Sequence, residues 1–177
     1  MRKRRFEKGL TALQMHLRRT LLLAAAAAAI VALTLGGTAG CSSQKEAAAD
    51  PTVEEIVARI AAAVDLSRMQ EGDAGTLKKL YGIDAADLEG FALYTAPTNI
   101  SADEILVVKL KDPDAAGAVQ EKMEKRVADR AARFKDYLPQ EYYKIEHHVL
   151  ETRGSCLLLA IAEDADKIAA AFDESFR

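Results

Sequence analysis

The chain has 177 residues, of which half are hydrophobic, and its 24 basic and 27 acidic residues give a formal net charge of −3. So high an apolar content excludes an intrinsically disordered chain. Two cysteines are too few for a disulfide-stapled mini-protein, and the length favours one folded domain.

Residues 1–40 are predicted to be a signal peptide. Their basic residues lie at positions 2, 3, 4, 5, 8, 18 and 19, against the single acid Glu7. Residues 21–35 follow, in which Thr34 is the only residue that is not apolar. A basic start, an apolar run and an exit of small residues are typical of secretory signal peptides. The run is shorter than the roughly 20 residues of a membrane-spanning helix.

The exit sequence Thr38-Ala39-Gly40-Cys41 resembles the bacterial lipobox, although Thr38 stands where leucine is usual. The resemblance implies cleavage between Gly40 and Cys41, a diacylglycerol on the Cys41 thiol and an acyl chain, such as palmitate, on the new N-terminus. Two alternatives are an ordinary signal peptide with a chance cysteine and an uncleaved anchor. Arg18-Arg19 before the apolar run weakly resembles a twin-arginine signal, which leaves the export route open.

Cleavage before Cys41 would leave 17 basic and 26 acidic residues, a net charge of −9. Such an acidic chain is a poor partner for nucleic acid or for an anionic lipid surface. Acyl chains on Cys41 can hold it to the bilayer regardless of charge. Residues 41–49 would form a lipidated tether, in which the eight residues after Cys41 span at most about 28 Å. We therefore expect the protein at the extracytoplasmic face of the cell membrane.

Residues 50–177 are predicted to form a single domain. In its first half we expect a helix from Asp50-Pro51 to near Leu66, helical turns at 76–81 and 83–88, and two strands at 91–95 and 104–110. In its second half we expect a helix over 113–138 capped by Asp112, two strands at 148–152 and 156–162 around Gly154, and a last helix capped by Asp164 or Asp166. The α-β-β-α-β-β-α order predicts an α+β fold with a four-stranded, mostly antiparallel sheet and packed helices. Residues 105–108 and 157–161 are apolar at consecutive positions, which places their strands inside a sheet of order 1-2-4-3.

Several short motifs resemble the bacterial domain of unknown function family 4358, which is found on lipoproteins. They are Leu80-Tyr81-Gly82-Ile83 with the residues to Glu89, Ser101-Ala102-Asp103-Glu104-Ile105 before a strand, Arg130, residues 134–139 and the hairpin at Gly154. The resemblance covers roughly residues 50–175. It implies an extracytoplasmic lipoprotein domain without an established activity.

Arg130 is the internal residue that most suggests a binding site. It lies within the apolar stripe of the predicted long helix, between Val127 and Phe134, and Tyr137 follows on the same face. A buried guanidinium needs a carboxylate, carbonyl groups or an anionic ligand. One interpretation is therefore an anion or peptide-carboxylate site formed by Arg130 and Tyr137. The alternatives are an arginine at the edge of the stripe and a structural ion pair.

Other polar residues are predicted to be structural. The basic residues of the long helix, Arg126 among them, are expected on a solvated face with the pairs Glu121–Lys125 and Asp129–Arg133. His147 and His148, as neighbours on a strand, would point to opposite faces, which disfavours a shared metal ion. Cys156 opens an apolar strand and is expected to be a buried thiol.

These observations predict a membrane-tethered binding or accessory domain, with no catalytic residue, metal or cofactor assigned. Its partner would be an envelope protein or a small ligand. A second hypothesis is a small extracytoplasmic hydrolase or thiol enzyme that uses Cys156 or an unrecognised pair of carboxylates. A third is a structural spacer without a ligand.

Overall fold

The computed structural model describes residues 50–177, so the predicted signal peptide, Gly40, Cys41 and the tether lie outside the described residues. The elements are α2 (Val53–Ala63), β1 (Gln70–Gly72), α3 (Ala74–Tyr81), η1 (Ala85–Asp87), β2 (Leu88–Thr95), β3 (Glu104–Leu110), η2 (Pro113–Ala115), α4 (Ala116–Phe134), α5 (Pro139–Glu146), β4 (Val149–Arg153), β5 (Cys156–Ile161) and α6 (Ala165–Glu174). Within this part of the chain, no helix has both the length and the apolar character that crossing a bilayer requires.

The predicted α+β fold class is confirmed: residues 50–177 form five α-helices and one antiparallel sheet of five strands in the order β1-β2-β3-β5-β4. Strands β3 and β5 are central, as their consecutive apolar residues predicted, and every residue of both is buried. The predicted order of the four longer strands is also correct. The prediction of only four strands is wrong, because β1 pairs with β2 and adds a fifth.

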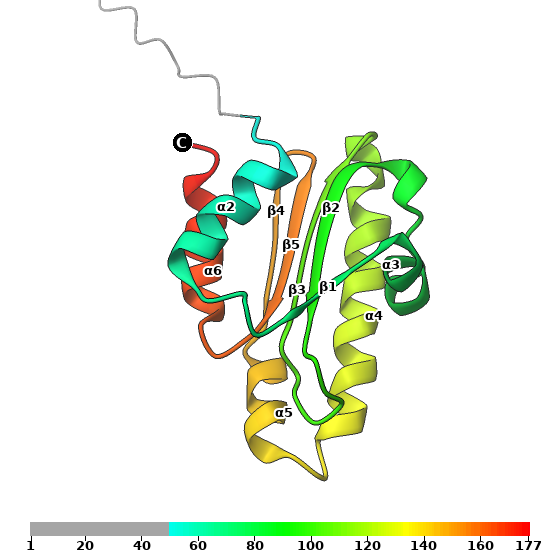
Figure 1. Ribbon diagram of the computed structural model, residues 1–177. Helices are drawn as coiled ribbons and strands as arrows, with labels where there is room; N and C mark the ends of the chain where they lie inside the picture. The colour runs from blue at the N-terminus through cyan, green and yellow to red at the C-terminus, as the bar shows by residue number, and fades with distance from the viewer. Residues whose placement is uncertain (1–49) are drawn as a thin grey trace, which may run out of the picture. The chain divides into compact units, whose positions relative to one another are not determined.

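The described residues form three layers (Figure 1): α2 and α6 cover one face of the sheet, α3 and α4 cover the other, and α5 lies at one end. Side chains of β3 alternate between two apolar clusters. Leu106 and Val108 pack in the cluster with α3 and α4, while Ile105 and Val107 pack in the cluster with α2 and α6. Both faces of the central strands are therefore buried.

The first helix begins later than predicted. Its N-cap is Thr52 rather than Asp50, because Thr52 Oγ1 accepts from the Glu55 amide and Glu55 Oε2 accepts from the Thr52 amide, forming a capping box. Asp50 instead pairs with Lys109, with Nζ and Oδ1 2.8 Å apart. The helix ends at Ala63 rather than near Leu66.

The predicted long helix is confirmed over η2 and α4 but ends at Phe134, four residues earlier than predicted, and a further helix that the sequence did not predict, α5, follows it. As predicted, Asp112 is the N-cap at the start of the long helix: the Asp112 side chain accepts a hydrogen bond from the Asp114 amide in the short 3-10 turn η2. The chain leaves helical geometry before Pro139, at Leu138 (φ −136°, ψ 79°), because the α conformation is disfavoured for a residue that precedes proline. Pro139 then opens α5, so Tyr137 belongs to neither helix. His147 caps α5 and His148 precedes β4, which places neither histidine on a strand.

The surface of α4 also differs from the prediction. The ion pair observed along the helix is Lys125–Asp129, at 2.8 Å, rather than Glu121–Lys125 or Asp129–Arg133. Arg126 is only 7% exposed, so its assignment to the solvated face is wrong.

Candidate functional site

The predicted ligand residue Arg130 lies at the edge of a buried ionic cluster centred on Glu104. Glu104 opens β3 and is completely buried. Arg126 on α4 donates through Nε and Nη2 to the two carboxylate oxygens of Glu104, at 2.8 and 2.7 Å. Nη1 of Arg130 is 3.3 Å from the same carboxylate, and its Nη2 donates to the Ser101 carbonyl at 3.0 Å. Arg130 therefore forms a structural ion pair, which was one of the alternatives to a ligand-binding role for this residue.

Tyr81, the last residue of α3, completes the Glu104 cluster. Its hydroxyl donates to Glu104 Oε1 at 2.5 Å. Burial, followed by the charge of Glu104, raises the pKa of Tyr81 well above its ordinary value, so the phenol remains a neutral donor. Tyr81, Glu104 and Arg130 all belong to the motifs that carry the family resemblance. The cluster gives these motifs a common physical role, which is to join α3, β3 and α4.

The structure does not bring Arg130 and Tyr137 into one cavity. Tyr137 follows the end of α4 and is 84% exposed. Neither residue lines any of the three hollows described below. A ligand-binding role for the pair stays a prediction, without support from their placement.

Cys156 and the two histidines occupy structural positions. Cys156 is 1% exposed, and burial raises the pKa of its thiol, so the geometry does not favour a reactive thiolate. His147 and His148 each bring Nδ1 within 2.9 Å of a main-chain oxygen of α5. Among residues 50–177, no three His, Cys, Asp or Glu side chains are grouped so that they could hold a metal ion.

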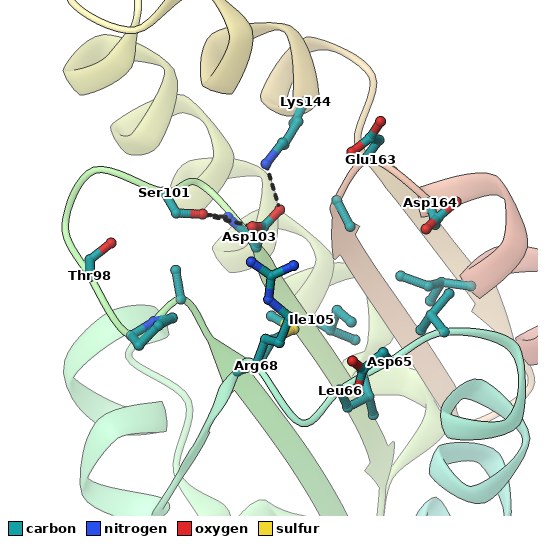
Figure 2. A pocket seen from close by; sticks show the side chains of 16 residues that line it. Asp65, Leu66, Arg68, Thr98, Ser101, Asp103, Ile105, Lys144, Glu163 and Asp164 are labelled. Carbon is teal, nitrogen blue, oxygen red and sulfur yellow. Dashed lines mark hydrogen bonds and ion pairs between the residues drawn. The ribbon is translucent and has the colours of Figure 1, made fainter.

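We take as the candidate site a hollow of about 560 Å³ at one end of the sheet, which we call the end cleft. Its walls are residues 64–69 after α2, parts of the β2–β3 loop (96–103), and residues 162–164 after β5. Its apolar surface comes from the partly exposed Val64, Leu66 and Met69, with the buried Ile105 and Ile168 behind them. Figure 2 shows the charged side chains that surround this surface, namely Asp65, Arg68, Asp103, Lys144, Glu163 and Asp164.

Some charges of the end cleft neutralise one another. Lys144 Nζ lies 3.0 Å from Asp103 and 3.1 Å from Glu141, and Asp103 also accepts from the Ser101 hydroxyl. Asp164 pairs with Lys167 at 2.6 Å. Hydrogen bonds from Ser67 hold the pKa of the Asp65 carboxyl below its ordinary value, so Asp65 is ionised at neutral pH.

Two charged side chains of the end cleft have no such partner. Within residues 50–177, neither Arg68 nor Glu163 forms an ion pair or a side-chain hydrogen bond, and both are exposed to solvent. Arg68 reaches toward Asp103 and Lys144 from the loop after α2, while Glu163 lies on the loop after β5 (Figure 2). The cleft therefore presents one guanidinium, that of Arg68, and two carboxylates, those of Asp65 and Glu163, that form no ion pair among residues 50–177; the charge of Arg68 also lowers the pKa of Asp65.

A second hollow, of about 910 Å³, adjoins the end cleft and shares Lys144, Ala162 and Glu163 with it. It follows α5, where the rings of Tyr143 and His147 stack with centroids 3.9 Å apart. A third hollow, of about 520 Å³, lies between α2 and the C-terminal residues, beside Asp50.

Sequence reasoning missed Arg68 and Glu163, because both lie in loops without periodicity. The Ser101 to Ile105 motif did point to this region: Ser101, Asp103 and Ile105 line the cleft, while Glu104 anchors the buried cluster. The burial of Arg126 could have been predicted from the sequence, since Arg126 follows the buried Val119 and Met123 at helical spacing and therefore lies on the same face of α4.

A family model described as a domain of unknown function (DUF4358) matches residues 62–162, which is more than half of the chain. The matched region runs from the end of α2 to just beyond β5 and includes the Glu104 cluster and most of the end cleft. No curated protein and no solved structure matches the chain.

Proposed function

Because this chain belongs to the DUF4358 family, in which no specific activity is defined, we propose its function from its own residues: it is a membrane-tethered binding domain that holds a small polar ligand in the end cleft. Cleavage after Gly40 and lipidation of Cys41 would anchor it at the extracytoplasmic face of the cell membrane. An envelope protein that receives or supplies the ligand is the natural partner.

The observation that carries this proposal is the construction of the end cleft. Its volume of about 560 Å³ lies within the range of small-molecule sites, roughly 300–1,000 Å³. Partly exposed apolar side chains form part of its lining, and charged groups that could orient a ligand surround it. A structural spacer without a ligand would not require a hollow with such a lining.

The position of the cleft also favours ligand capture from outside. Lys109, near the far end of β3, contacts Asp50 and the Pro51 carbonyl, where the described chain begins. Asp103 and Ile105, at the other end of β3, line the end cleft. Six residues of strand separate Asp103 from Lys109 by about 20 Å. A tether that ends at Asp50 would thus leave the cleft at the end of the domain remote from the attachment point.

The thiol-enzyme hypothesis has less support. A catalytic cysteine needs an accessible thiolate with a nearby base, whereas Cys156 is buried in the sheet and its pKa is raised.

The lipid anchor can be tested by expressing the full chain in a bacterium with an alkyne analogue of palmitate and measuring the mass of the membrane-bound product. We expect a cleaved, acylated protein whose label disappears in Cys41→Ala and persists in the matched control Cys156→Ala. An uncut chain, or label that persists in Cys41→Ala, would contradict the anchor.

Ligand binding can be tested on the processed protein, extracted in detergent, by a thermal-shift screen of amino acids, short peptides, sugars, polyamines and phosphate. We expect at least one compound to raise the melting temperature of the wild type but not that of Ala162→Trp, which places an indole in the cleft. Ala58→Trp, on the exposed surface of α2, is the control. If no compound stabilises the wild type, or if Ala162→Trp responds equally, the binding proposal fails.

A further inference from the structure

We infer that the ligand of the end cleft is a zwitterion, either an amino acid or a short peptide, whose carboxylate binds Arg68 and whose ammonium binds Glu163. This inference rests on the proposed function and assigns the ligand class of the same cleft.

Arg68 is the cation of the end cleft that is available to a ligand. The other cation, Lys144, already contacts Asp103 and Glu141. The guanidinium of Arg68 extends into the cleft (Figure 2) and has no ion-pair or hydrogen-bond partner within the described residues. A guanidinium offers five donors in a planar fork, which suits a carboxylate bound through both oxygens.

Glu163 is the matching anion. Its neighbour Asp164 is engaged by Lys167 at 2.6 Å, and Asp103 is engaged by Lys144 and Ser101. Asp65 accepts a hydrogen bond from the Ser67 amide at 2.9 Å. Glu163 has no ion pair among residues 50–177, and it lines the edge of the cleft on the loop after β5, whereas Arg68 lies on the loop after α2 (Figure 2). An ammonium group is the natural partner of this carboxylate.

The remaining charges and the apolar lining narrow the ligand class. Four acidic and two basic side chains surround the cleft, so a simple anion would be repelled by the excess of carboxylates. A simple amine would leave Arg68 without a partner. Val64, Leu66 and Met69, which are partly exposed, provide apolar surface for an aliphatic side chain. A ligand with a carboxylate, an ammonium and an aliphatic side chain satisfies all three features.

The test uses leucyl-leucine, its N-acetyl form and its C-terminal amide, with the processed protein labelled with nitrogen-15. Amide shifts of cleft residues would report binding at concentrations up to about 10 mM, which saturates a site with a dissociation constant near 1 mM. We expect the free dipeptide to bind about tenfold or more tightly than either capped form, because each cap removes a charge-assisted contact.

Two variants assign the contacts. Arg68→Gln should abolish the preference for the free carboxylate over the amide, and Glu163→Gln should abolish the preference for the free amine over the acetylated form. Arg59→Gln on α2 and Glu174→Gln on α6, both exposed, are the matched controls and should leave both preferences intact.

The outcomes separate this inference from the proposed function. Equal binding of all three peptides, or cleft shifts caused only by a sugar, a polyamine or phosphate, would overturn the zwitterion assignment and retain a binding domain. If neither the peptides nor any compound of the screen shifts the cleft residues, both proposals fail.

Discussion

Arg126 holds Glu104 through both carboxylate oxygens, at 2.8 and 2.7 Å, in a position where both side chains are almost completely buried. The pair joins α4 to the first residue of β3, and Tyr81 adds α3 to the same carboxylate. Charges in such a site stabilise the fold only while every partner is present, because an unpaired buried charge is strongly unfavourable.

Glu104→Gln is therefore expected to destabilise the protein by about 3–5 kcal/mol, since it leaves Arg126 and Arg130 without a countercharge. Urea unfolding followed by circular dichroism measures the effect. Lys125→Gln, which removes one partner of an exposed pair on the same helix, is the control and should cost less than about 1 kcal/mol. Equal effects of the two substitutions would contradict a stabilising role for the cluster.

Arg130→Met separates the structural role of Arg130 from a role in ligand binding. The variant loses the 3.0 Å hydrogen bond to Ser101 and the 3.3 Å contact with Glu104, while the stronger Arg126 pair remains. We expect a loss of about 1–3 kcal/mol in unfolding free energy, smaller than that of Glu104→Gln, and unchanged ligand binding in the end cleft. Normal stability together with lost binding would instead favour the ligand role.

Glu151 is expected to make stability depend on pH. Burial and then the charge of Asp173 raise the pKa of this carboxyl above its ordinary value of 4.5. The folded state then binds the proton more tightly than the unfolded state, so ionised Glu151 destabilises the fold above its folded pKa. The penalty disappears as the pH falls below about 4.5.

Glu151→Gln should consequently raise the melting temperature at pH 7.5, corresponding to less than about 1 kcal/mol because the side chain is partly exposed, and have little effect at pH 4. Scanning calorimetry at the two pH values measures this difference. Glu174→Gln is the control, and the prediction is refuted if Glu151→Gln lowers the melting temperature at pH 7.5.

Two glycine substitutions should have opposite effects. A Cβ at Gly72 would lie 2.7 Å from Cδ2 of Leu93, which is fully buried and has little room to move, so Gly72→Ala is expected to cost about 1–3 kcal/mol. A Cβ at Gly117 on α4 meets no atom within 4 Å, so Gly117→Ala should stabilise the helix by about 0.5–1 kcal/mol. Chemical denaturation of both variants provides the comparison.

Cys156 should be unreactive in the native protein. Burial both excludes reagents and raises the pKa of the thiol. Iodoacetamide at pH 8, followed by mass analysis of the peptide that contains Cys156, should show modification only after denaturant is added. Rapid alkylation of the folded protein would revive the thiol-enzyme hypothesis.

Local patterns in the sequence determined much of the fold. Consecutive apolar residues identified β3 and β5 as central strands, because only a strand covered on both faces can be apolar at every position. The order of the four longer strands followed from this. The strand β1 escaped prediction because its three residues, Gln70–Gly72, are polar or small, and β2 supplies the pairing that makes them a strand.

Tertiary structure alone decided the buried cluster and the candidate site. The signal peptide, the lipobox and the acidic character of the domain can be proposed from neighbouring residues. The contacts of Glu104 with Arg126 and of Asp103 with Lys144 join residues 22 and 41 positions apart. The end cleft likewise draws its walls from three separate loops. Hydrophobic periodicity indicates which face of a helix or strand is buried. It does not indicate which distant side chain contacts that face, because the contact depends on how the helices pack on the sheet.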